Sequence, residues 1–139
     1  MKRLLASIFA LVVLVTLVPA ANAAQGCTAA TLTGNYAFTF SGFFQNQGRN
    51  SPISGIGSGT LDGQGNVSAT VTASFDGNLS TFPYTGTYTV NPDCTGSVTG
   101  TPGSGLANFS IVIVRGGAEV LGAERDPGNT WTIDFKKQN

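Results

Sequence analysis

Segments in which polar and apolar residues alternate, separated by turns rich in Gly, Asn, Asp and Pro, repeat along the chain from residue 32 to its end. Residues 67–75 are the clearest example, because Val67, Ala69 and Val71 share one face and Ser or Thr residues stand between them. This period of two is typical of a strand with one buried and one exposed face. No stretch after residue 24 shows the 3.6-residue period of a helix. The alternation therefore predicts an all-β protein.

The turn residues divide this part of the chain into eight expected strands. They span residues 32–43, 54–61, 67–75, 83–90, 95–101, 106–114, 118–124 and 130–136. Residues 45–52 are polar, and we expect them to form a loop. Most other connections are short. Asp76-Gly77-Asn78, for example, consists of residues that accept the positive φ of a tight hairpin turn. Tight turns between short strands indicate an antiparallel up-and-down meander.

A meander of this length has to protect its edges, either by closing into a barrel or by folding into two packed sheets. Glycines within the expected strands favour closure, because they permit the sharp coiling of a small barrel. They are Gly55, Gly57, Gly59, Gly86 and Gly122. A β-sandwich is the alternative, but Greek-key crossovers need long connections and few are present. We predict a single antiparallel up-and-down β-barrel of about eight strands in residues 25–139.

The first 24 residues have the features of an export signal. Lys2 and Arg3 precede an apolar run over residues 4–18, and the small residues Ala21-Asn22-Ala23 follow it. Charge, apolar core and A-x-A cleavage site, in that order, are typical of a Sec signal peptide. The run is short for a membrane span. We therefore predict that residues 1–24 are removed. The mature protein would then be periplasmic or extracellular, with no membrane span.

The mature chain would keep two cysteines, Cys27 and Cys94. In an oxidising compartment such a pair is most simply a disulfide, which here would tie the mature N-terminus to a turn. A redox pair is the first alternative, but C-x-x-C spacing is absent. Lipidation of Cys27 is the second, although Ala24 stands where a lipoprotein signal has a bulky aliphatic residue. The sequence favours a structural disulfide.

The charge pattern excludes several classes of function. Loss of Lys2 and Arg3 leaves five basic and seven acidic side chains, and only Lys136 and Lys137 stand together. Nucleic acids are bound by clustered Lys and Arg, so we expect no nucleic acid partner. The chain contains no histidine, which excludes a Ser-His-Asp triad. We also expect no cofactor.

Two acidic features are candidates for chemistry, and each has a plainer explanation. Glu119 or Glu124 could be the base of a barrel enzyme, since a carboxyl near a barrel interior has a raised pKa. The alternative is that they solubilise an outer face and pair with nearby Arg or Lys. Residues 62–66 look like a calcium loop but lack its distal Glu, and a hairpin turn explains them. We expect a non-enzymatic protein with no catalytic or metal site.

Three motifs carry a resemblance that covers most of the mature chain. They are L-x-G-x-Y at residues 32–36, D-G-x-G-N at residues 62–66 and G-x-Y-x-V-N-x-D-C-x-G at residues 86–96. In these the chain resembles small exported bacterial proteins of uncharacterised function. The resemblance implies a β-barrel in the broad style of lipocalins. It implies no activity and no site residues.

Two functions from different classes follow from a barrel of this kind. The first is a binding module that holds a small apolar ligand in its mouth, and the second is a structural or cell-surface interaction protein with a packed core. An eight-stranded barrel either fills its interior with side chains or holds one small ligand. Large aromatic residues on several strands favour filling, whereas the many Gly and Ala residues favour free space. On balance the composition favours a packed interior.

Overall fold

The computed structural model describes residues 26–101 and 107–139, so the predicted signal peptide at residues 1–24 lies outside the described residues. Eight strands and two short 3-10 helices make up the described part. The strands are β1 (Thr33–Asn46), β2 (Arg49–Asp62), β3 (Asn66–Phe75), β4 (Asn78–Val90), β5 (Thr95–Gly100), β6 (Asn108–Val114), β7 (Glu119–Glu124) and β8 (Thr130–Lys137), and the 3-10 helices are η1 (Ala29–Thr31) and η2 (Arg115–Gly117).

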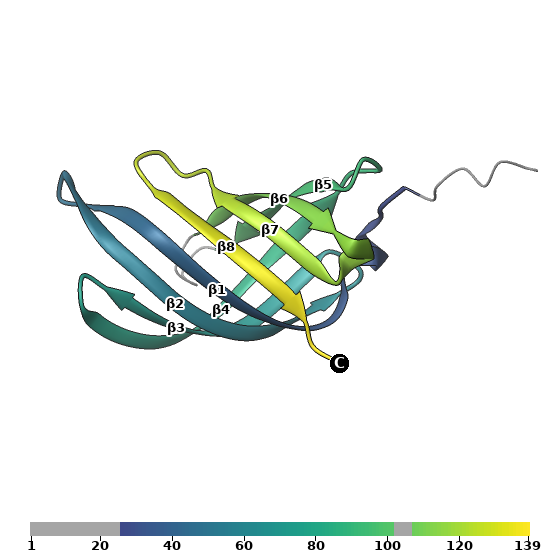
Figure 1. The fold of residues 1–139 in the computed structure, drawn as a ribbon, viewed down its shortest axis with the longest axis horizontal. Coiled ribbons are helices and arrows are strands. Elements are labelled where there is room, and N and C mark those ends of the chain that lie inside the picture. The colour runs from purple at the N-terminus through teal and green to yellow at the C-terminus, as the bar shows by residue number, and fades with distance from the viewer. Residues whose placement is uncertain (1–25, 102–106) are drawn as a thin grey trace, which may run out of the picture.

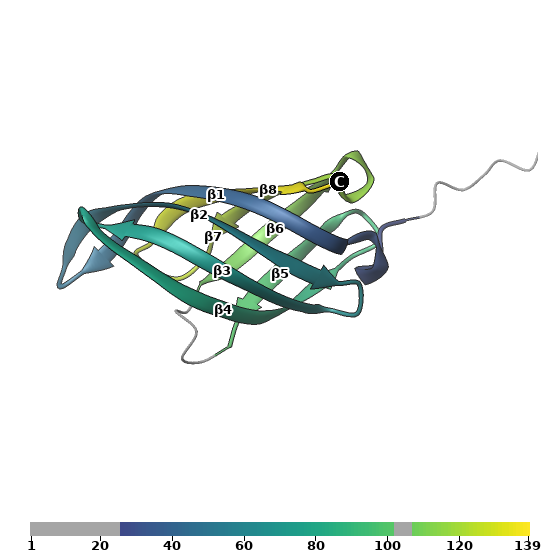
Figure 2. The same ribbon diagram turned by 90° about the horizontal axis from the view of Figure 1, so that it is seen from below.

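The strands form one closed barrel in chain order (Figures 1 and 2). All neighbours are antiparallel, and β8 pairs with β1 from Tyr36 opposite Lys137 to Phe43 opposite Thr130. Each strand therefore has two hydrogen-bonded neighbours, although β4 pairs with β5 only from Gly86 to Val90 and its earlier residues extend beyond that pairing. The predicted up-and-down barrel is confirmed, and the β-sandwich alternative is wrong.

The predicted polar loop at residues 45–52 is wrong. β1 and β2 stay paired as far as Asn46 opposite Arg49, so Gln47 and Gly48 alone make the turn. Both have positive φ, 50° and 78°, as a two-residue hairpin turn requires. The polar residues beside this turn are exposed because the hairpin continues past the core, where one-sided burial no longer imposes alternation.

Strand length divides the barrel into two halves. β1 to β4, the long half, contain 14, 14, 10 and 13 residues, whereas β5 to β8, the short half, contain 6, 7, 6 and 8. The β1–β2 and β3–β4 hairpins reach past the short half (Figures 1 and 2). We call the end with these turns and the β7–β8 turn the hairpin end. The opposite end, with the β2–β3, β4–β5 and β6–β7 turns and η1, is the N-terminal end.

Two glycines of β2 allow the rings of β1 to lie flat against the barrel wall. A Cβ atom added at Gly55 would lie 2.3 Å from the ring of Phe40, and one added at Gly57 would lie 2.3 Å from the ring of Phe38. Real Cβ atoms do not approach this closely, so any larger residue would displace a buried ring. The glycine-rich second strand therefore makes room for aromatic side chains inside the barrel.

The N-terminal end is covered by the residues before β1. Cys27 is disulfide-bonded to Cys94 in the β4–β5 turn, with 4.9 Å between their Cα atoms, so the predicted disulfide is confirmed. Its sulfur is thus not free to carry a lipid. The backbone N–H of Cys27 also donates to the carbonyl of Pro92. The short helix η1, which the alternation pattern did not predict, then leads to Leu32, whose side chain is fully buried.

Two buried tyrosines bond backbone carbonyls at this end of the barrel, Tyr88 in the cover and Tyr36 in η2. The Tyr88 hydroxyl lies 2.9 Å from the carbonyl oxygen of Leu32 and 3.1 Å from that of Ala29. The Tyr36 hydroxyl donates to the carbonyl of Gly117, 2.7 Å away, in η2. Burial, and secondarily the other tyrosine, raises the pKa of Tyr36 above its usual value. Both hydroxyls therefore act as neutral donors to backbone carbonyls.

Candidate functional site

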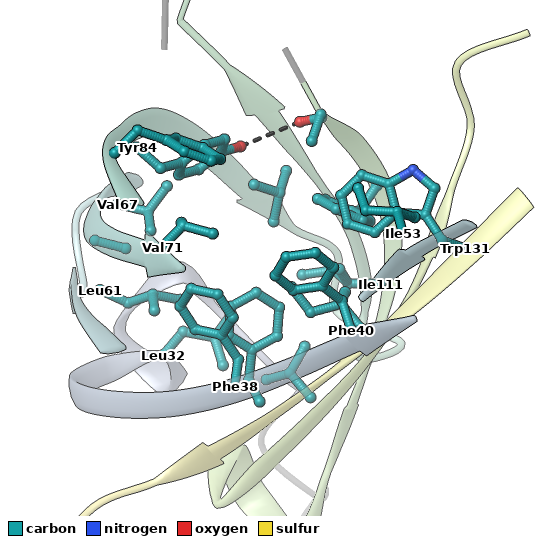
Figure 3. Close-up of a pocket in the computed structure, with 18 of the residues that line it drawn as sticks. Leu32, Phe38, Phe40, Ile53, Leu61, Val67, Val71, Tyr84, Ile111 and Trp131 are labelled. Atoms are coloured by element: carbon teal, nitrogen blue, oxygen red, sulfur yellow. Dashed lines mark hydrogen bonds between the residues drawn. The ribbon is translucent and has the colours of Figure 1, made fainter. Parts of the chain in front are cut away.

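A cavity of about 180 Å³ lies inside the barrel (Figure 3). Its walls are almost wholly apolar, since Tyr84 and Trp131 are the lining residues with a polar side-chain atom. The labelled side chains in Figure 3, among them Leu32, Phe38 and Ile111, come from both halves of the barrel. An apolar cavity of roughly 150 Å³ in a protein stays dry and admits benzene. This cavity is therefore large enough for a small ring compound and too small for a long-chain lipid.

The burial of the lining residues shows where the cavity can be reached. At the N-terminal end the lining residues Leu32 and Leu61 are 0% and 5% exposed. Towards the hairpin end the lining residues Phe75, Phe82 and Trp131 are only partly buried. The cavity is thus closed by the N-terminal cover and is accessible from the hairpin end.

The aromatic residues line the cavity in contacting groups instead of filling it. At the hairpin end the Phe75 ring lies 5.5 Å from Phe44 and 6.1 Å from Phe82, between ring centroids. Further in, Trp131 lies 5.1 Å from Phe40 and 4.9 Å from Phe109. Offset and edge-to-face arrangements of this kind are the ones in which aromatic rings attract each other. The interior is consequently packed along the wall but keeps free space, which the composition alone did not favour.

The polar atoms of the lining gather on one side of the cavity. In Figure 3 the Tyr84 hydroxyl and the Trp131 nitrogen lie along the same side of the carbon-lined space. The Tyr84 hydroxyl donates to the Ala107 carbonyl, 3.1 Å away. The Trp131 Nε1 atom is buried and has no hydrogen-bond partner among the described residues. We call this side the polar rim.

Glu124 is a neighbour of this rim, although it is not one of the residues that line the cavity. Its side chain is on the inward face of β7, as that of Val120 is, and it pairs with Phe109 of β6. The last residue pair between β7 and β8 is Ala123 with Thr132, one position before Glu124. Continuing that register puts Glu124 beside Trp131. Its Oε1 atom accepts hydrogen bonds from the backbone N–H groups of Asn108, Arg125 and Asp126, at 3.3, 3.2 and 3.0 Å.

The other carboxylate oxygen, Oε2 of Glu124, is buried and accepts no hydrogen bond from the N–H and O–H groups of the described residues. Burial, above all, raises the pKa of Glu124 to about 7, and the neighbouring Asp126 carboxyl, which can share its proton, adds to the rise. Burial, with the charges of Glu124 and Asp126, likewise raises the pKa of Tyr84 to about 12. At pH 8 Glu124 is thus largely ionised, and Tyr84 of the rim is neutral.

The two carboxylates singled out in the sequence are not brought together. Glu119 lies on the opposite face of β7 from Glu124, alongside the exposed Leu121, and its Oε2 atom is 3.7 Å from Nε of Arg115. This placement agrees with a solubilising, ion-paired role for Glu119. The rim residues Tyr84 and Trp131 were missed as a site because only the barrel's closure brings their strands together.

The calcium-like run at residues 62–66 is a hairpin turn. One oxygen of the Asp62 carboxylate accepts the backbone N–H groups of Gln64 and Asn66, and the other accepts the Asn66 side chain. These hydrogen bonds, the Asn66 side chain first, lower the pKa of Asp62. The carboxylate is therefore satisfied by its own turn. The described residues also hold no group of three or more metal-ligating side chains.

Comparison with protein-family models gives no match, and comparison with curated proteins gives none either. In the described part of the chain, no helix is both long enough and apolar enough to cross a membrane. The function therefore has to be argued from the cavity and its rim.

Proposed function

We propose that this protein is an exported, non-enzymatic carrier that binds one small apolar molecule inside its barrel. The observation that carries the proposal is the cavity of about 180 Å³, walled almost entirely by apolar side chains and reachable from the hairpin end. Burial of apolar ligand surface in such a space is favourable by roughly 25 cal/mol per Å². The alternative is a structural barrel with a packed core. The cavity favours the carrier, because a fully packed core would leave no such space.

Ligand binding can be followed with the protein's own fluorescence. Trp131 is the single tryptophan of the chain and lines the cavity, so a ligand that enters changes its emission. We expect ethylbenzene, titrated into the disulfide-bonded mature protein, to give a saturable change. Isothermal calorimetry provides a second readout.

A matched pair of variants shows whether the ligand is inside. Val71 is buried in the cavity wall, whereas Thr70, its neighbour on β3, faces solvent. Val71→Phe should fill the cavity and weaken ethylbenzene binding at least tenfold, while Thr70→Phe should leave the affinity within about twofold. No saturable binding to the folded wild-type protein, or equal effects of the two variants, would contradict the carrier.

We further propose that export follows removal of residues 1–24, as the resemblance to small exported proteins suggests. The Cys27–Cys94 disulfide is compatible with an oxidising compartment. Mass spectrometry of the protein recovered outside the cytoplasm of a bacterial host should give the mass of a chain starting at residue 24 or 25. It should also be lower by two hydrogens than the reduced form. An uncleaved chain in the cytoplasm would contradict export.

A further inference from the structure

We infer that the ligand of the carrier is an aromatic hydrocarbon, with one six-membered ring, a short alkyl substituent and no hydrogen-bonding group. This inference rests on the proposed carrier function and adds the chemistry of its ligand. Two observations carry it. The described cavity wall offers no free hydrogen-bond donor, and much of that wall consists of aromatic rings.

The side chains of the described cavity wall give a polar ligand group almost nothing to bind. Tyr84 and Trp131 are the only described lining residues with a polar side-chain atom, and none is charged. The Tyr84 hydroxyl already donates its hydrogen to the Ala107 carbonyl, 3.1 Å away. The Trp131 Nε1 atom is so deeply buried that it presents almost no surface to a water-sized group. These side chains therefore hold no donor that a ligand can use.

The backbone of the paired strands does not supply the missing partners. Its N–H and C=O groups bind the neighbouring strands of the closed barrel, so they do not point into the cavity. A carbonyl, ether or charged group of a ligand would lose its water there without gaining a partner, which is unfavourable. A ligand hydroxyl has one acceptor within reach, the Tyr84 oxygen, and its own oxygen would stay unpaired. The cavity consequently selects against hydrogen-bonding groups.

Aromatic rings face the cavity from several sides. Eight of the nineteen described lining residues are aromatic, and they come from β1, β3, β4, β6 and β8. The rings of Phe40 and Phe109 lie at 51° and 90° to that of Trp131, and Phe82 lies beside Phe75 at the open side. Aromatic rings attract one another in such tilted and edge-to-face arrangements beyond the effect of burial alone. An aromatic ligand can join these contacts, whereas a saturated ring cannot.

The size of the cavity sets the size of the ligand. Its volume of about 180 Å³ is slightly larger than the roughly 150 Å³ of a cavity that admits benzene. One benzene ring with a short alkyl substituent therefore fits the space. Ethylbenzene is a ligand of this class.

The first test asks whether the cavity rejects a polar group. Ethylbenzene and benzyl alcohol have the same number of non-hydrogen atoms, and Trp131 fluorescence and calorimetry measure their affinities for the disulfide-bonded mature protein. We expect benzyl alcohol to bind at least about tenfold more weakly than ethylbenzene, because its hydroxyl is buried without adequate partners. Tyr84→Phe should leave both affinities within about twofold of the wild-type values. A smaller difference between the ligands, or a selective loss of benzyl alcohol in this variant, would overturn the hydrocarbon assignment while the carrier stands.

The second test asks whether the wall recognises an aromatic ring. Phe82→Leu removes one ring from the wall, and Ile111→Leu is a control that changes the shape of another apolar lining residue. Because the two ligands differ in hydrophobicity, the measured quantity is the ratio of the ethylbenzene affinity to the ethylcyclohexane affinity in each protein. We expect this ratio to fall about threefold in Phe82→Leu and to stay within about 1.5-fold in Ile111→Leu.

Each outcome of these tests has a separate meaning. An unchanged affinity ratio in Phe82→Leu, or the same fall in both variants, would contradict the aromatic assignment and leave the carrier intact. Ethylbenzene binding by Ile111→Leu shows that a variant with an altered wall is folded. If none of the three ligands binds the folded wild-type protein, the carrier itself is wrong.

Discussion

The two ends of the barrel are built from different kinds of interaction. At the N-terminal end the Cys27–Cys94 disulfide and the Tyr88 hydroxyl fasten the residues before β1, and the Tyr36 hydroxyl bonds the Gly117 carbonyl of η2. At the hairpin end the cavity is bordered by partly buried aromatic rings, among them Trp131, whose buried Nε1 atom has no hydrogen-bond partner among the described residues. The contacts that stabilise the barrel thus include a disulfide and buried hydroxyls at the first end, and the open side of the cavity lies at the second.

The recurring motifs of the sequence all lie at the N-terminal end. Tyr36 of L-x-G-x-Y bonds η2, Tyr88 of the third motif holds the cover, and Asp62 closes the β2–β3 turn. Asp93 accepts the N–H and hydroxyl of Thr95 in the β4–β5 turn beside Cys94. These motifs describe how the barrel is closed. They carry no information about the ligand, which is why the resemblance implied no site.

Removing the disulfide at the N-terminal end should have the largest effect on stability. The double variant Cys27→Ser with Cys94→Ser opens a loop with a sequence separation of 67 residues. Its loss should lower the free energy of unfolding by about 4 kcal/mol on the loop-entropy model. Guanidinium unfolding curves measure the loss.

Ethylbenzene affinity is the control for this variant, and it should change little at temperatures where the protein stays folded. A parallel fall of affinity and stability would mean that the two ends are not independent.

A smaller effect is expected from two matched tyrosine variants. Tyr36→Phe removes a buried hydroxyl and leaves the Gly117 carbonyl unpaired, so stability should fall by about 1–2 kcal/mol. Tyr84→Phe removes a hydroxyl from the partly buried polar rim, where water can replace it, so stability should fall by less. Thermal unfolding measures both. Equal losses would mean that the two hydroxyls contribute alike to stability at the two ends.

The smallest effect is a pH dependence at the hairpin end. Because the folded pKa of Glu124 is about 7 and its ordinary value is 4.5, the folded state binds more protons than the unfolded state between these values. Stability should therefore fall as the pH rises from about 4.5 to 7 and then stay level. The side chain is only half buried, so solvent screening keeps the fall small.

Glu124→Gln should flatten this part of the stability curve, measured by thermal unfolding at a series of pH values. The chain has no histidine to titrate in the same range, and hydrogen bonds lower the pKa of Asp62 and Asp93. Any remaining slope in the variant would assign the effect to another group.

Much of the fold could be predicted from local patterns. Alternation along residues 67–75 identified the buried face of β3, and the Asp76-Gly77-Asn78 turn identified its hairpin. The prediction of a loop at residues 45–52 was wrong. The β1–β2 hairpin extends past the core there, so its polar and apolar residues do not alternate as they do in a strand with one buried face. Near the site, the sequence indicated Glu124 but did not distinguish it from Glu119, since only the strand register shows which of them faces inward.

An all-β chain, the number of strands, the disulfide and the absence of histidine chemistry could all be predicted from the amino-acid sequence, because each depends on local spacing or residue type. The free space inside the barrel is a property of the tertiary structure. The volume of a cavity depends on how rings from β1, β6 and β8 pack against one another, as Phe40, Phe109 and Trp131 do. The tertiary structure also sets which polar atoms stay unpaired, because pairing requires strands far apart in sequence to meet.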